Sequence, residues 1–290
     1  MTFHQVVVGV DGSLIAVRAL DRAAEEAVRR GAVLRVVYAV PDRDEAGPVL
    51  ASAAARARAR HPGLRVVTAA VQGGPVEALT RESGDAALTV VGTRGFNAVS
   101  GLMFGSVSLR LAVHARGPLM VVRDDHPCDR GTPSTERGRE LGDAPAVLLG
   151  VESDADADAA VYAFQEAERR GARLSVLHAS TRRHLTPELP SLVPATSPGQ
   201  DRQALADRAE DAVPRFTLAH LEERHPEVVV DARAVRTAPT QALLKATRDA
   251  SVVVIGAHRR TGRLGHHLGP VAHALLHRSH CPVVLVPIAA

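Results

Sequence analysis

The segment Glu25–Val40, EEAVRRGAVLRVVYAV, occurs a second time in the chain as QEAERRGARLSVLHAS, at Gln165–Ser180. Each version begins with a helix-like stretch, reaches a glycine after two arginines, and continues as a run rich in apolar residues. A glycine at the end of a helical pattern, followed by such a run, is typical of a helix that leads into a strand. The repeat therefore predicts alternating helices and strands, and its recurrence indicates that one such fold is present twice.

A second pair of matching segments extends the repeat toward the C-terminal part of each copy. Val71–Arg123 aligns with Val235–Pro287 at a constant offset of 164 residues and without a gap. Because the first pair is offset by only 140 residues, we place an insertion at Thr181–Gln200, a stretch that contains several Pro and Ser residues. The residues that match at the larger offset include Pro75 and Pro239, Gly92 and Gly256, Gly105 and Gly269, and Pro118 and Pro282.

The duplication predicts two domains, at residues 1–123 and 146–290, joined by a polar linker at residues 124–145. The apolar runs of the first copy are continuous rather than alternating, which favours strands buried on both faces of a parallel sheet. We therefore expect an α/β protein with two tandem doubly wound five-stranded parallel sheets, packed as an intramolecular pseudo-dimer through their last strands, 119–122 and 283–286. In the first copy, the expected strands are 6–10, 34–40, 64–71, 87–92 and 119–122, and the expected helices are 15–30, 49–60, 75–82 and 107–115.

The composition is that of an ordinary globular protein. The formal net charge is +3, with 23% charged and 46% hydrophobic residues, and no apolar stretch approaches the roughly 18 residues of a membrane helix. Basic residues are interspersed with acidic ones, and aromatic residues are few, so we expect no nucleic-acid partner and no membrane association. Two cysteines and an N-terminus that runs directly into a strand pattern fit a cytoplasmic protein.

The stretch after the fourth expected strand, GTRGFNAVSGLMFGS at Gly92–Ser106, carries the strongest chemical signal. Glycines here let the backbone turn sharply and present N–H groups to an anion, and the helix that follows favours a phosphate at its N-terminus. Asp11, at the end of the first strand, can accept hydrogen bonds from ribose hydroxyls or an adenine amine. Since ligands of open α/β sheets bind beyond the carboxyl ends of the strands, these residues predict a nucleoside polyphosphate site.

With these motifs the chain resembles the tandem-domain universal stress proteins. The family's G-2x-G-9x-G-(S/T) motif is matched in full, its first-strand aspartate falls on Asp11, and its adenine-contacting valine falls on Val40. The resemblance implies a strand order of 3-2-1-4-5 and one ATP, bound with Mg²⁺, in the first copy. It also leaves a homodimer open. The expected nucleotide-binding residues are Asp11, Gly12, Ser13, Val40, Gly92, Thr93, Arg94, Gly95, Gly105, Ser106 and Val107.

The second copy departs from this pattern at most ligand positions. Asp11 is replaced by Glu152, Val40 by Ser180, Gly95 by Arg259 and Ser106 by Pro270, which has no N–H to offer. We therefore expect one competent nucleotide site and one degenerate one. The histidines that crowd the end of this copy, among them His258, His273 and His277, are interpreted as packing or interface residues, and Cys281 as a small buried residue.

Three functions remain open from the sequence. The first is an ATP-binding stress-response protein that acts through nucleotide-dependent conformation or partner contacts. The second is a slow ATPase or a nucleotidyl- or phosphoryl-transfer enzyme, for which Asp11 and Asp124 are the only loose acid–base candidates. The third is an interaction module with vestigial sites. The first is preferred, with no catalytic residue and no protein-bound metal assigned, because no nucleophile or base accompanies the glycine motif.

Overall fold

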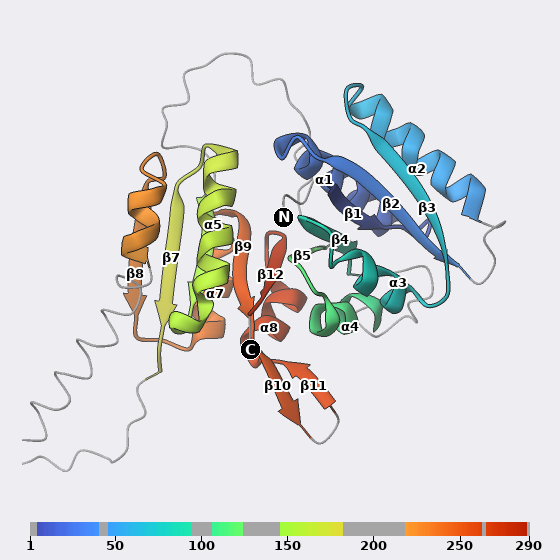
Figure 1. Cartoon of the computed structure of the whole chain (residues 1–290). Coiled ribbons are helices and arrows are strands. Elements are labelled where there is room, and N and C mark those ends of the chain that lie inside the picture. The colour runs from blue at the N-terminus through green and yellow to red at the C-terminus, as the bar shows by residue number, and fades with distance from the viewer. Residues whose placement is uncertain are drawn as a thin grey trace, which may run out of the picture.

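The computed structural model describes residues 5–40, 46–93, 106–123, 146–181, 218–262 and 265–288. The predicted linker and nearly all of the predicted insertion lie outside these residues. The described residues form a ten-stranded sheet and a separate two-stranded hairpin (Figure 1). No helix among them is both long enough and apolar enough to cross a membrane.

The first copy alternates strands and helices close to the predicted positions. Its last helix begins at Ser106 rather than at Val107, so the serine of the glycine motif is the first helical residue. The elements are β1 (Gln5–Gly9), α1 (Leu14–Arg29), β2 (Val33–Val40), α2 (Gly47–Arg60), β3 (Val66–Gln72), α3 (Pro75–Glu82), β4 (Leu88–Gly92), α4 (Ser106–His114) and β5 (Leu119–Val122).

The second copy repeats this arrangement and adds a hairpin that the sequence did not predict. The hairpin strands, β10 and β11, pair antiparallel between β9 and α8. The elements are β6 (Ala146–Val151), α5 (Ala157–Arg170), β7 (Leu174–Ala179), β8 (Val230–Val235), α7 (Pro239–Ala246), β9 (Ala250–Ala257), β10 (Arg259–Gly262), β11 (Gly265–Leu268), α8 (Pro270–Arg278) and β12 (Val283–Pro287).

The repeated Arg-Arg-Gly sequence forms the same turn in both copies. Gly31 follows α1 with φ +58°, and Gly171 follows α5 with φ +56°. This left-handed conformation is costly for residues with a Cβ, so glycine ends the helix and turns the chain into the next strand. The shared sequence thus specifies a shared helix–strand corner.

One sheet runs through both copies, in the order β3-β2-β1-β4-β5-β12-β9-β6-β7-β8. Each half has the expected 3-2-1-4-5 order, with parallel pairing inside each half. The halves meet where β5 and β12 pair antiparallel, with Met120 opposite Val284. This confirms the prediction that the last strands join the two copies.

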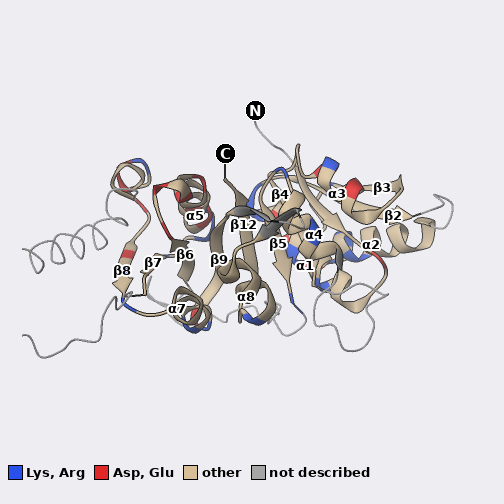
Figure 2. Cartoon of the chain, turned by 90° about the horizontal axis from the view of Figure 1, so that it is seen from below, with Lys and Arg blue, Asp and Glu red and all other residues tan. Residues whose placement is uncertain are grey.

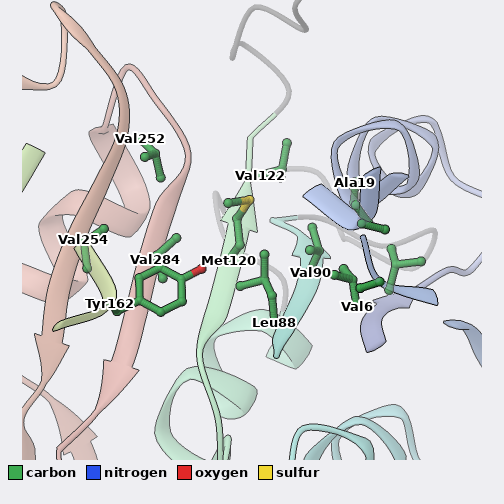
Figure 3. Close-up of a cluster of buried hydrophobic side chains, with 14 of the residues drawn as sticks. Val6, Ala19, Leu88, Val90, Met120, Val122, Tyr162, Val252, Val254 and Val284 are labelled. Carbon is green, nitrogen blue, oxygen red and sulfur yellow. The ribbon is translucent and has the colours of Figure 1, made fainter. Parts of the chain in front are cut away.

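Helices cover both faces of the sheet, and each face has its own hydrophobic core (Figure 1). One core lies between the sheet and α1, α2 and α5, and the other lies between the sheet and α3, α4, α7 and α8. The first core continues across the β5–β12 junction, where Figure 3 shows Tyr162 between the side chains of the two halves. The two copies are therefore joined by packing as well as by strand pairing.

A buried ionic cluster also joins the copies, through α1 and α5. Its members, Glu26, Arg30, Glu166 and Arg170, are named here the Arg–Glu cluster. Arg30 contacts Glu26 on its own helix and Glu166 on α5, at 2.6 Å from Nη2 to Oε2. Arg170 likewise contacts Glu166 and reaches back to Glu26. Both carboxylates are fully buried.

The arginines of the Arg–Glu cluster keep the Glu26 carboxylate charged. Burial alone would raise the pKa of Glu26, but Arg170, Arg30, Arg22 and Arg29 lower it from 4.5 to about 2. Elsewhere, basic and acidic residues are spread over both copies in the view of Figure 2. Within the described residues, the ion pairs of the Arg–Glu cluster link α1 of the first copy to α5 of the second.

Candidate functional site

The carboxyl ends of β1 and β4 lie side by side in the first copy. These strands pair parallel with Val8 opposite Val90, so the residues after each strand emerge at the same edge of the sheet. The neighbouring β2 ends there as well, with Val40. This edge, where the chain turns to either side of β1, is the switch point at which doubly wound sheets bind ligands.

Asp11 is fixed at this edge by Ser13. Its Oδ1 accepts hydrogen bonds from the backbone N of Ser13 at 3.0 Å and from Ser13 Oγ at 2.6 Å. Ser13 Oγ in turn accepts from the backbone N of Ala16 and caps α1. Gly12 between them has φ +81°, a conformation that favours glycine. The V-D-G-S sequence thus builds a turn that orients a carboxylate and starts a helix.

Val40 is buried at the end of β2, and its carbonyl accepts a hydrogen bond from the backbone N of Gly73 at 3.2 Å. Its side chain belongs to the core under α1 and α2. The structure therefore brings Val40 to the same edge as Asp11, with its backbone beside the turn that follows β3.

Gly92 has a packing role that the sequence interpretation did not include. A Cβ at this position would lie 2.7 Å from Ile15 Cγ1, closer than real Cβ atoms come, and 3.2 Å from Ile15 O, which is also tight. Glycine is therefore required for α1 to approach the end of β4. The next residue, Thr93, is buried, donates its N–H to Val122 O at 3.0 Å and accepts from Ser108 Oγ at 3.4 Å. The first contact ties the end of β4 to β5, and the second, to the Thr93 carbonyl oxygen, ties it to the first turn of α4.

The remaining predicted residues of the first copy are placed only in part. Arg94, Gly95 and Gly105 lie outside the described residues. Ser106 is the first residue of α4, and Val107 packs partly buried against the core of that face. The edge therefore holds Asp11, Gly12, Ser13, Val40, Gly92, Thr93 and the start of α4.

The equivalent edge of the second copy contains a buried carboxylate. Asp156 is 1% exposed, and its Oδ2 accepts from the backbone N of Glu152 at 2.7 Å and of Ser153 at 3.2 Å. Its Oδ1 lies 2.9 Å from His258 Nε2. Burial opposes the charged form, but the hydrogen bonds from His258 and from these backbone N–H groups lower the pKa of Asp156 below its ordinary value.

The pairing of His258 with Asp156 was missed by the sequence interpretation, which treated His258 as a packing or interface residue. They are 102 positions apart, and only the pairing of β6 with β9 brings them together. One signal was readable: Ser153 and Asp156 form an S-x-x-D capping box. Two other histidines of this copy, His273 and His277, lie on α8 with their ring centroids 4.4 Å apart. Burial and the neighbouring His273 lower the pKa of His277.

Cys281 is buried as predicted. It is 3% exposed, and burial raises the pKa of its thiol to about 12. Since the thiolate is the nucleophilic form, this cysteine is unreactive near neutral pH.

The topology defines a doubly wound α/β protein, duplicated in one chain, with a switch point in each half of the sheet. The universal stress protein family model matches residues 2–56, 43–123 and 145–287. The chain belongs to the universal stress protein family.

Known relatives span the duplication. Universal stress protein MT2052 of Mycobacterium tuberculosis is 32% identical over 321 residues, which cover 98% of this chain and 95% of the relative. A universal stress protein structure from Archaeoglobus fulgidus shares the fold with a TM-score of 0.66 at 18% identity, over 98% of this chain and 96% of the other. A second Archaeoglobus fulgidus universal stress protein, solved in complex with dAMP, covers 42% of this chain and 98% of its own at 27% identity and a TM-score of 0.35.

Proposed function

We propose that the first copy binds ATP with Mg²⁺ at the edge formed by β1, β2 and β4, and that the protein acts in stress response through nucleotide-dependent conformation or partner contacts. The observation that carries the proposal is the Asp11 carboxylate, held by Ser13 at the switch point beside the end of β4. A complete G-2x-G-9x-G-S sequence follows β4. The proposal includes the domain bounds 1–123 and 146–290, and it places the protein in the cytoplasm.

The residues of the edge fit an adenine nucleotide. A carboxylate can accept hydrogen bonds from sugar hydroxyls, and the two hydrogen bonds from Ser13 hold Oδ1 of Asp11 in place. Arg94, Gly95 and the start of α4 would meet the phosphates, because backbone N–H groups and a helix N-terminus favour anions. Bound ATP would add negative charge at this edge, and its binding or hydrolysis would change the conformation of the neighbouring loops.

The first test is the ultraviolet spectrum of the purified protein. The chain has no Trp and two Tyr, so co-purified nucleotide would dominate its absorbance near 260 nm. Mass spectrometry of the denatured supernatant would then identify the base and the number of phosphates.

The second test is calorimetric titration with Mg-ATP. Asp11→Ala should weaken ATP binding by about tenfold or more, because hydrogen bonds to a charged group contribute roughly 1.5–3 kcal/mol. Asp85→Ala removes the same charge from the start of β4, at the opposite end of the sheet, and should leave binding unchanged. Equal affinities in both variants would overturn the site. If the natural chain hydrolyses ATP and Asp11→Ala does not, the enzymatic function would take the place of the proposed binding function.

A further inference from the structure

The second copy contains a cavity of about 560 Å³ at its own switch-point edge. The cavity lies between the ends of β6, β7 and β9 and the starts of α7 and α8. Its walls are mainly apolar, from Val151, Leu177, Leu243, Ile255 and Val271, with a few polar groups among them. A volume of this size with sparse polar groups is typical of small-molecule sites, which occupy roughly 300–1,000 Å³.

The charges at this cavity oppose an anionic ligand. Asp156 is buried and charged in its wall, and Glu152 Oε2 lies 3.9 Å from His258 Nε2. Whether His258 is neutral or protonated, these three side chains carry a net negative charge. A polyphosphate would therefore approach the buried charge of Asp156, where repulsion is stronger than in water, while the mostly exposed Glu152 adds a weaker, solvent-screened repulsion.

The backbone around the cavity also offers less to a phosphate than the glycine motif does. The chain after β9 forms the β10–β11 hairpin, in which Arg259 pairs with Leu268 and Thr261 with His266. Hydrogen bonds of this ladder use backbone groups that an anion nest would leave open. The helix that follows begins with Pro270, whose nitrogen has no hydrogen to donate.

One ring nitrogen of a buried histidine at the cavity lacks a hydrogen-bond partner within the described residues. His178 is 7% exposed and lines the cavity, and its Nδ1 lies 3.0 Å from the Val151 carbonyl oxygen. Because a carbonyl only accepts, Nδ1 donates, and the neutral ring then has a lone pair on Nε2. Nε2 is buried without a partner within the described part of the chain. A ligand N–H or O–H that reaches it would remove the cost of that unsatisfied atom.

We propose that this cavity is a second, distinct binding site, specific for an uncharged ligand of nucleoside size that carries N–H or O–H donors, and that it rejects phosphorylated nucleotides. The site does not depend on ATP binding in the first copy. In this proposal, the sequence differences at Glu152, Asp156, His258 and Pro270 give this edge a different ligand specificity and do not merely abolish nucleotide binding.

Adenosine and ATP are the matched probes, because they differ only in the phosphates. In the full chain carrying Asp11→Ala, calorimetry should show adenosine bound at one site and ATP bound there at least tenfold more weakly. Thr240→Trp, at the start of α7, fills the cavity and should abolish this adenosine binding. The matched control is Val76→Trp, the repeat-equivalent position on α3, which should leave it intact.

Circular dichroism of both Trp variants confirms that they fold. Adenosine binding that survives Thr240→Trp, ATP that binds the cavity as tightly as adenosine, or the absence of adenosine binding would each overturn the proposal. These outcomes are separate from the test of the first copy, since they are measured with Asp11 already removed.

Discussion

Gly92 and Gly256 occupy the same place in the two copies, yet each faces a different neighbour. A Cβ on Gly92 would meet the side chain and the carbonyl oxygen of Ile15, whereas a Cβ on Gly256 would overlap the Asp156 carboxylate and lie 2.7 Å from Ile288 Cδ1. The second copy therefore places a hydrogen-bonded carboxylate at a position where the first copy has none. The duplicated backbone is the same in both halves, while the side chains at the carboxyl ends of the strands differ in charge.

The largest expected effect comes from the Arg–Glu cluster, to which both copies contribute residues. Glu26→Ala and Glu166→Ala should each lower the free energy of unfolding by about 3–5 kcal/mol, because each leaves buried arginines uncompensated. Urea denaturation of the full chain measures the loss. Asp231→Asn, which removes an exposed ion pair with Arg233, is the control and should not move the midpoint. A large difference between the two cluster variants would show that the junction is not symmetric.

Acid should weaken the same junction. The pKa of Glu26 is lowered from 4.5 in the unfolded chain to about 2 in the fold, so its charge stabilises the protein above pH 4.5. That contribution should be lost progressively as the pH falls from about 4.5 toward 2. Urea midpoints measured across this range should drop less steeply in Glu26→Gln than in the natural chain. Parallel curves would mean that other carboxylates govern acid unfolding.

Substitutions of Gly92 and Gly256 test directly the difference between the two edges. Gly92→Ala and Gly256→Ala should each destabilise the protein by about 1–3 kcal/mol, because the added methyl group overpacks the junction. Gly256→Ala should cost more, since Asp156 is held by three hydrogen bonds while part of Ile15 can rotate away. Gly47→Ala, in open space at the start of α2, should be neutral or slightly stabilising. Equal costs at Gly92 and Gly256 would argue that the neighbour is unimportant.

The smallest expected effect is at the helix cap of the first copy. Ser13→Ala removes the Oγ that caps α1 and orients Asp11, and it should cost about 1 kcal/mol of stability. The same variant should weaken ATP binding less than Asp11→Ala does, because the Ser13 backbone N still holds the carboxylate. Calorimetry and urea denaturation of one preparation measure both effects. An ATP affinity as poor as that of Asp11→Ala would make Ser13 itself a ligand contact.

The sequence predicted the strands well because they are local features. The apolar runs, the repeated glycine corner and the prolines at helix starts specify elements through neighbouring residues alone, and α3 begins and ends where expected. The joining of β5 and β12 could be predicted because short edge strands need a partner.

The features that the sequence did not reveal depend on distant residues. Asp156 and His258 meet only after β6 and β9 have paired, and nothing near His258 in sequence marks it as a partner. The hairpin β10–β11 occupies the stretch that aligned with the glycine motif, so the repeat itself concealed it. The ion pairs of the Arg–Glu cluster join residues 136 and 144 positions apart, and they form only when the two copies pack together.

The antiparallel pairing of β5 with β12 has a consequence for how such a protein can change. When two identical chains associate, one gene specifies both halves, and every substitution appears twice. Here separate stretches of one chain encode the two halves, which remain together in a one-to-one ratio at any protein concentration. One half is thus free to drift toward a new ligand while the other retains the ancestral one, and the continuous sheet keeps both in a single molecule.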